Sequence, residues 1–158
     1  MIRAFNLKKF LSSVVYPVGG GVLSAILTSG AMKSYADMSE PPLSPPGWVF
    51  PVVWTILYIL MGISLYIIRE SAVSRCQKND AILKFAIQLI LNILWPIWFF
   101  SFRLCTFAAV WLVVLIISVA LMINAFSKIS RTAAYIQIPY LLWCIFALYL
   151  NIGICVLR

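Results

Sequence analysis

The sequence predicts an all-α integral membrane protein, a single bundle of five transmembrane helices formed by residues 1–158. Of the 158 residues, 64% are hydrophobic and 10% are charged, whereas soluble domains carry roughly 25% charged residues. The apolar residues form five runs, each long enough to cross a hydrocarbon core of about 30 Å as a helix. The expected helices lie at about 10–32, 47–68, 81–100, 105–126 and 132–156.

Basic residues precede the first helix, as they do in a signal peptide: Arg3, Lys8 and Lys9. The apolar run is too long for the hydrophobic region of a signal peptide and has no abrupt stop, so we expect the helix to be retained. Its sequence carries a small residue at every fourth position, Gly20, Ser24 and Thr28. This ladder predicts close packing against a neighbouring helix.

A proline-rich loop at about 33–46 leads into the second helix. Its prolines hold the chain extended, because each fixes its own φ and restricts the preceding residue. We expect Ser44 to cap the second helix, with Pro45 or Pro46 in its first turn. Trp54 and Tyr58 lie one turn apart on one face of that helix. The stiff loop and the aromatic face predict the lid and wall of a pocket, and the alternative is an aromatic belt at the membrane interface.

The third helix follows a short charged link and carries amides in an apolar setting. Gln88, Asn92 and Trp95 share one face, since they are spaced at i, i+4 and i+7. The two amides must find partners, because an unpaired polar group in hydrocarbon costs several kcal/mol. Two interpretations remain open: the amides join helices to one another, or they line a ligand cavity. Pro96 follows directly and predicts a bend that opens space in the bundle.

Short links join the third helix to the fourth and the fourth to the fifth, so we expect these neighbours to be antiparallel. Trp143, Ala147 and Asn151 form a similar ladder on the fifth helix. The small Ala147 leaves room for a flat ring system against Trp143, and the alternative is ordinary packing with one satisfied asparagine. Pro139 precedes this ladder and predicts a kink.

The distribution of positive charge predicts the orientation. The net charge of +8 would indicate nucleic acid in a soluble protein, but here the basic residues lie between apolar runs, so topology and anionic lipid explain them and no nucleic-acid partner is expected. The amino-terminal segment and the second and fourth links hold nine basic residues, against three elsewhere. In a bacterial plasma membrane the amino terminus would therefore be cytoplasmic and the proline-rich loop external.

Conventional catalytic groups are missing from the sequence. It contains no histidine, and all four acidic residues lie outside or at the edges of the apolar runs, so neither a proton-driven pump nor a hydrolase is predicted. The four cysteines show no C-x-x-C spacing, which makes a zinc or redox site unexpected. We expect Cys144 and Cys155 to act as small hydrophobic residues. No catalytic residue, metal ligand or cofactor is assigned.

Several segments together resemble one family. PPGWVF at 45–50 is followed by VWT and LYILMG, and later come QLILNILWPIWFF at 88–100, PYLLW at 139–143 and FALYLN at 146–151. These segments are similar to those of the tryptophan-rich sensory protein family, also called translocator protein or peripheral-type benzodiazepine receptor. The resemblance implies a five-helix bundle, a homodimer and a cavity for porphyrins and similar planar ligands.

The resemblance also implies which residues bind the ligand. The positions that match family residues at the ligand site are Tyr35, Trp54, Gln88, Asn92, Trp95 and Trp143. Ala147 and Asn151, which share a helical ladder with Trp143, complete the predicted ligand-binding residues. Two loop residues depart from the family pattern: Ser34 replaces a tryptophan and Glu40 stands where lysine is usual. The carboxy-terminal cholesterol pattern is missing, because no tyrosine stands between Leu150 and Arg158.

Three functions follow from this resemblance. The leading hypothesis is a membrane receptor or transporter-like protein that binds porphyrins for sensing, handling or transport. The second is an enzyme that promotes light- and oxygen-dependent breakdown of protoporphyrin, which would rely on the photochemistry of the porphyrin itself. The third is a structural membrane partner protein whose tryptophans only anchor it in lipid.

Overall fold

The computed structural model describes residues 5–32 and 40–157 of the chain, and within them no β-strand occurs. Their helices, in chain order, are α1 (Leu7–Met32), α2 (Val49–Glu70), α3 (Arg75–Pro96), the π-helical η2 (Ile97–Ser101), α4 (Cys105–Ser127), α5 (Arg131–Ile136) and α6 (Ile138–Leu157). In this part of the chain they combine into five spans that are long and apolar enough to cross a membrane. The predicted fold class is therefore confirmed.

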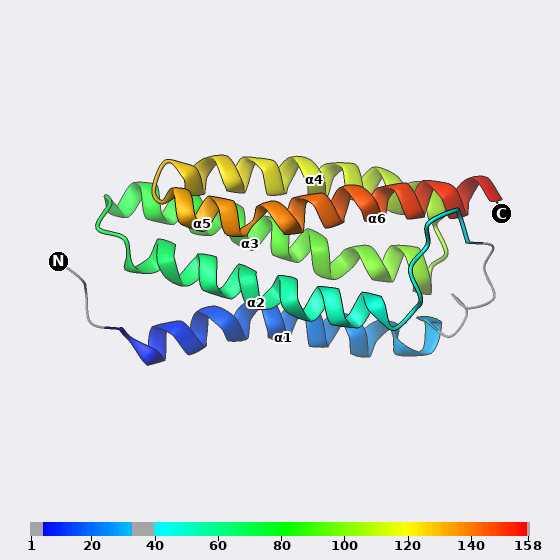
Figure 1. The fold of residues 1–158 in the computed structure, drawn as a ribbon, viewed down its shortest axis with the longest axis horizontal. Helices are drawn as coiled ribbons and strands as arrows, with labels where there is room; N and C mark the ends of the chain where they lie inside the picture. The colour runs from blue at the N-terminus through cyan, green and yellow to red at the C-terminus, as the bar shows by residue number, and fades with distance from the viewer. Residues whose placement is uncertain (1–4, 33–39, 158) are drawn as a thin grey trace.

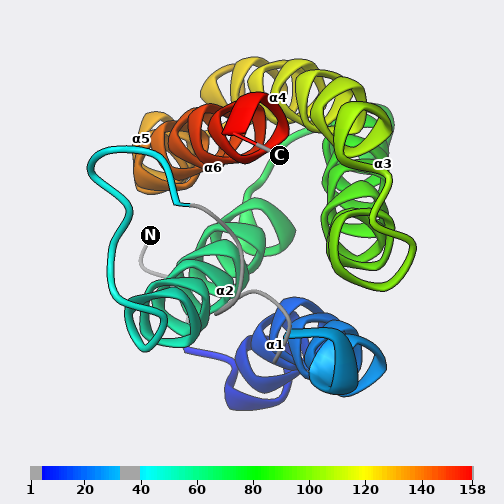
Figure 2. The ribbon, with the colours of Figure 1, turned by 90° about the vertical axis from the view of Figure 1, so that its right-hand side faces the viewer.

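The spans run side by side along one long axis, and α1 begins at the opposite end of the bundle from the end of α6 (Figure 1). Seen end-on, they form a ring in the order α1, α2, α5 with α6, α4 and α3, which closes again on α1 (Figure 2). Consecutive spans are antiparallel, as the short links predicted for the third, fourth and fifth helices. Five crossings place the start of α1 and the end of α6 on opposite sides of a membrane.

One helix start and one helix cap differ from the prediction. α3 begins at Arg75 rather than near residue 81, because the Ser74 hydroxyl accepts a 3.3 Å hydrogen bond from the Gln77 amide and caps a polar first turn. α2 begins at Val49, and Ser44 does not cap it. The Ser44 hydroxyl instead donates to the Pro41 carbonyl at 2.8 Å, within the proline-rich loop.

Prolines interrupt two spans where the sequence predicted bends. After Pro96 the α-helix changes to the π-helical η2, in which the Phe102 amide bonds the Ile97 carbonyl at 3.0 Å. The fifth span is divided at Gln137, between α5 and α6. Pro139 lacks the N–H that would bond four residues back, so the helix cannot continue unbroken there.

Small residues bring α1 into close contact with α2 and α3. A Cβ on Gly20 would lie 2.5 Å from Ile93 Cδ1, and the Ser24 hydroxyl donates to the Ile93 carbonyl at 3.0 Å. A Cβ on Gly62 would lie 2.5 Å from the Val14 Cα. The small-residue ladder of α1 thus serves the close packing it predicted.

A disulfide joins the start of α4 to the end of α6. It links Cys105 and Cys155, whose Cα atoms are 5.7 Å apart. Cys155 is therefore not the free apolar residue that the sequence predicted, because the fold brings together two cysteines that their spacing in the chain leaves unrelated. Cys144 is a free, buried cysteine, in agreement with its predicted role.

The proline-rich loop is tied to the same end of α6. The Tyr149 hydroxyl donates to the Pro42 carbonyl at 2.6 Å. Pro41 is buried against Gly153, where a Cβ would come within 2.5 Å of the proline ring. These contacts fix the described part of the loop, residues 40–48, across one end of the bundle.

Candidate functional site

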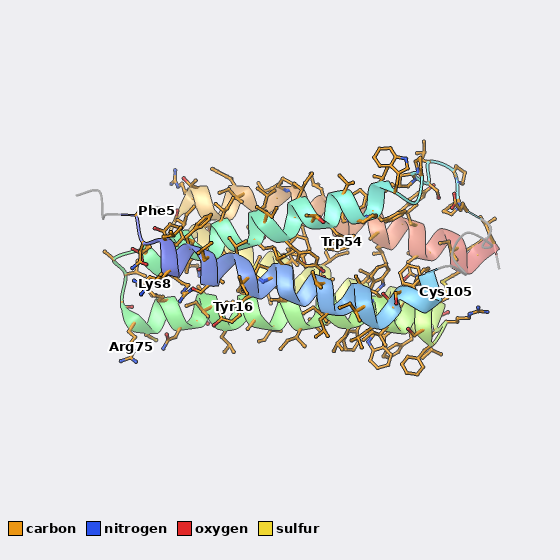
Figure 3. The ribbon with its side chains drawn as sticks, turned by 90° about the horizontal axis from the view of Figure 1, so that it is seen from below. Phe5, Lys8, Tyr16, Trp54, Arg75 and Cys105 are labelled. Carbon is orange, nitrogen blue, oxygen red and sulfur yellow. A yellow bond between two sulfur atoms is a disulfide. The ribbon has the colours of Figure 1, made fainter. Side chains whose placement is uncertain are left out.

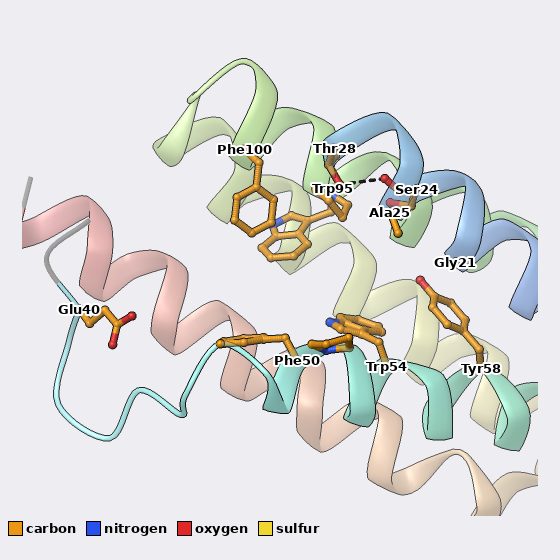
Figure 4. Close-up of a pocket in the computed structure, with 13 residues that line it drawn as sticks. Gly21, Ser24, Ala25, Thr28, Glu40, Phe50, Trp54, Tyr58, Trp95 and Phe100 are labelled. Carbon is orange, nitrogen blue, oxygen red and sulfur yellow. Dashed lines mark hydrogen bonds between the residues drawn. The ribbon is translucent and has the colours of Figure 1, made fainter. Parts of the chain in front are cut away.

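A cavity of about 380 Å³ lies between α1, α2 and the end of α3, beside the loop at 40–48. Figure 4 shows aromatic side chains of α2 facing those of α3 and η2 across it. Its lining residues are Gly21, Ser24, Ala25, Thr28, Glu40, Gly47, Phe50, Pro51, Trp54, Tyr58, Trp95, Pro96 and Phe100. Most of these are aromatic or small, so the cavity is an apolar slot with aromatic walls.

The helix α2 supplies one wall through residues spaced four apart. Phe50, Trp54 and Tyr58 therefore lie on one face of α2, and the rings of Trp54 and Tyr58 stack with their centroids 5.7 Å apart. The opposite wall comes from Trp95 and Phe100, whose ring centroids are 6.1 Å apart. The π-helical turn after Pro96 permits this pairing, because it places residues five apart on the same side.

The helix α1 supplies a flat, small-residue side. Gly21 is essential there, because a Cβ at this position would overlap the Tyr58 ring. Ser24 and Thr28 are buried, and the Thr28 hydroxyl donates to the Ser24 carbonyl at 2.8 Å. Their hydroxyls are thus satisfied within the protein and leave an apolar surface toward the cavity.

A chain of hydrogen bonds lies directly behind the α2 wall. The Tyr58 hydroxyl donates to Asn92 Oδ1 at 2.6 Å, and Asn92 Nδ2 donates to the Tyr140 hydroxyl at 2.8 Å. The Tyr140 hydroxyl in turn donates to Gln88 Oε1 at 2.7 Å. All four residues are buried. This chain joins α2, α3 and α6, and it fixes the orientation of the Tyr58 ring at the inner end of the cavity.

Of the sequence-predicted site residues that the structure describes, two lie in the cavity lining, Trp54 and Trp95. Gln88 and Asn92 lie in the buried chain of hydrogen bonds, which corresponds to the interpretation that amides join helices. Asn151 accepts a 3.3 Å bond from Trp95 Nε1 and donates to the Cys105 carbonyl at 3.0 Å. It therefore orients Trp95 from behind.

The remaining predicted residues lie elsewhere. The half-buried Trp143 packs beside the cavity wall, with its ring centroid 6.0 Å from that of Phe50. Its Nε1 is buried and has no hydrogen-bond partner among the described residues. Ala147 is buried in the core. Tyr35 lies outside the described residues.

Sequence reasoning missed most of the α1 side and the part played by two tyrosines. The small-residue ladder on α1 was recognised as a packing surface, but its exposed neighbour Ala25 was not recognised as part of a pocket. Tyr58 was noted as an aromatic neighbour of Trp54, whereas Tyr140 carried no signal beyond following Pro139. Its role depends on the crossing of α6 with α3, which the sequence does not specify.

Five apolar spans among the described residues define a multi-pass integral membrane protein, and an apolar cavity with aromatic walls lies between three of its helices. Comparison with known proteins then gives the family. Residues 13–157 match the sequence model of the TspO/MBR family, and the chain belongs to that family.

Curated relatives agree with this assignment. The chain is 38% identical over 120 residues to the "Tryptophan-rich protein TspO" of Chlorobaculum tepidum, covering 76% of each chain. It is 35% identical over 156 residues to the protein of the same name from Archaeoglobus fulgidus, covering 97% of this chain and 99% of the other. It is also 35% identical over 137 residues to the "Translocator protein" of Bos taurus, covering 85% and 81%.

Proposed function

We propose that this protein binds porphyrins and similar planar hydrophobic ligands in the cavity between α1, α2 and α3, for sensing, handling or transport. The observation that carries the proposal is the set of aromatic walls, with Trp54 on one side and Trp95 on the other. The volume of about 380 Å³ falls within the 300–1,000 Å³ that is typical of small-molecule sites. A planar ring stacks on such walls in an offset arrangement.

The tryptophans provide a direct binding assay. Porphyrin in the pocket quenches tryptophan fluorescence, so a titration in neutral detergent and in the dark measures affinity. Illumination of the same complex, followed by product analysis, then tests the light-dependent breakdown of porphyrin. Binding without product supports a receptor or transporter, and product that requires the pocket supports the enzymatic alternative.

Trp54→Phe and Trp95→Phe should each weaken porphyrin binding by less than tenfold. A stacked aromatic contact contributes about 0.5–1.5 kcal/mol beyond its buried area, and a tenfold change in affinity corresponds to about 1.4 kcal/mol. Because both side chains would contact the same ring system, the double variant should be non-additive.

Trp98→Phe is the matched control for this series. The Trp98 ring packs on Phe102 and Phe107, outside the cavity lining, and its Nε1 has no partner among the described residues. The substitution therefore removes an indole without removing a hydrogen bond. If Trp98→Phe and Trp54→Phe lowered porphyrin affinity equally, the quenching would arise at the lipid-facing surface rather than in the cavity.

We also propose that the end of the bundle that bears the disulfide faces outward across a bacterial plasma membrane. Lys8 and Arg75 lie at one end and Cys105 at the other (Figure 3). Basic residues favour the cytoplasmic side, and disulfides persist on the oxidising side. Both considerations give the same orientation, with a cytoplasmic amino terminus.

Reporter fusions test this orientation. An enzyme reporter that works only in the cytoplasm should be active when it is inserted in the α2–α3 link at 71–74, and one that works only outside should be inactive there. After Arg158 the reverse is expected: a reporter that works only outside the cytoplasm should be active there, because five spans separate the termini. The reverse pattern would contradict the proposed orientation, and the same side for both would contradict the five crossings.

A further inference from the structure

Among the described residues that line the cavity, a single one is charged. Of its thirteen described lining residues, Glu40 is the only one that carries a formal charge at neutral pH. Figure 4 shows it on the loop side, beyond Phe50, whereas Tyr58 lies at the opposite end of the α2 wall. Glu40 is exposed, and so is Gly47 on the same loop. The carboxylate therefore stands at the mouth of the cavity.

The loop holds Glu40 in this place. The next residue, Pro41, is buried against Gly153, and the Pro42 carbonyl accepts the 2.6 Å bond from Tyr149. Both anchors lie on α6, across the mouth from α3. These anchored prolines hold the backbone of Glu40 beside the mouth, because a proline restricts the backbone of the residue before it.

Most other polar groups of the lining are already bonded within the protein. Ser24 donates to the Ile93 carbonyl, Thr28 to the Ser24 carbonyl and Tyr58 to Asn92. Trp95 Nε1 donates to Asn151. Glu40, in contrast, forms no ion pair with any described residue. Its carboxylate is thus available to a ligand, and it is the only charge among the lining residues that the structure describes.

The aromatic walls, like the Glu40 carboxylate, favour a positively charged group at the mouth of the cavity. The face of an aromatic ring is electrostatically negative and attracts cations. Phe50 and Phe100 are the wall residues drawn nearest to Glu40 in Figure 4. A positive group at the mouth would therefore meet a carboxylate and negative ring faces, whereas a carboxylate there would meet only repulsion. At the edge of a bilayer this repulsion is less screened than in bulk water.

We propose that the cavity selects planar aromatic ligands whose outer edge is cationic or donates hydrogen bonds, and that Glu40 determines this specificity. The proposal rests on the proposed function, since it assumes that the ring system lies between Trp54 and Trp95. The flat body of the ligand occupies the apolar slot, and its charged edge remains at the mouth beside Glu40. Ligands with carboxylates on that edge are disfavoured.

A series of porphyrins that differ only at the edge tests this proposal. Protoporphyrin carries two carboxylates, its dimethyl ester is neutral, and its bis-amide with ethylenediamine carries two ammonium groups. In neutral detergent and in the dark, the native protein should bind the diamine most tightly, then the ester, then the diacid. We expect about fivefold between diamine and diacid, the upper range for an exposed charge pair.

Two variants assign the preference to Glu40. Glu40→Gln should bring the three affinities close together, and Glu40→Lys should reverse their order. Because Glu40 is exposed, neither change removes a packed side chain. Asp80→Lys is the matched control: it makes the same change of charge at the start of α3, at the opposite end of the bundle, and should leave the order unchanged.

The outcomes separate this proposal from the one on which it rests. If the neutral ester binds and Trp54→Phe weakens it, but the order of affinities is the same in the native protein and in Glu40→Lys, the inference about Glu40 is wrong and the cavity stands. A native protein that binds the diacid most tightly also overturns it. If the neutral ester does not bind at all, the proposed function fails and this inference fails with it.

Discussion

A bulky group attached at residue 25 should lower the affinity for porphyrin more than tenfold. Ala25 lines the cavity and is exposed to it, so a cysteine at this position is accessible to a thiol reagent. In an Ala25→Cys protein, reaction with benzyl methanethiosulfonate places a phenyl ring in the slot where the porphyrin would lie. Cys76→Ser removes the exposed native thiol, and Cys144 is buried. Fluorescence quenching before and after labelling measures the loss.

The matched control is Ile26→Cys, labelled in the same way. Ile26 is 65% exposed and is not part of the cavity lining, so its adduct should leave affinity unchanged. Bound porphyrin should also slow the labelling of Ala25→Cys without slowing that of Ile26→Cys. Equal effects at both positions would contradict binding inside the bundle and would place the porphyrin on the lipid-facing surface.

Replacement of Asn92 by leucine should lower the free energy of unfolding by about 2 kcal/mol. The change removes the acceptor of the Tyr58 hydroxyl and one bond to the Tyr140 hydroxyl. A buried donor left without a partner costs about 1–3 kcal/mol, although polar contacts between membrane helices average only about 0.6 kcal/mol. Thermal unfolding in detergent measures the difference.

The control for Asn92→Leu is Asn124→Leu on α4, where the residue is exposed and the same substitution should change stability little. Porphyrin affinity per folded molecule should fall only slightly in Asn92→Leu, because Asn92 is not part of the cavity lining and acts through the Tyr58 ring. Unchanged stability with a more than tenfold loss of affinity would contradict this account and would assign Asn92 to the ligand.

The architecture was predictable because membrane-spanning helices can be recognised in a sequence by their length and hydropathy. The errors lie at polar boundaries. The first turn of α3 is rich in polar residues, and the Ser74 cap that starts it carries no apolar signal. The disulfide was missed for a related reason: Cys105 and Cys155 become neighbours only when α4 packs beside α6.

The site was predictable only in part. Trp54 and Trp95 are found at the cavity, but the amides selected with them, Gln88 and Asn92, lie behind its wall. The sequence of a helical face is the same whether its polar residues contact a ligand or another helix. Only the packing of Tyr140 against Gln88 and Asn92 shows that these amides join helices. The ligand roles of Tyr35, Trp143 and Ala147, and the homodimer, stay predictions.

The central claim is that a planar ligand lies inside the bundle, between α2 and α3. The most direct test is a structure of the protein with the neutral protoporphyrin dimethyl ester bound. The account predicts density for the ring between Trp54 and Trp95, one edge at Glu40 and the Tyr58–Asn92 hydrogen bond intact behind it. Ring density on the lipid-facing surface, or between two copies of the chain with the cavity empty, would contradict it.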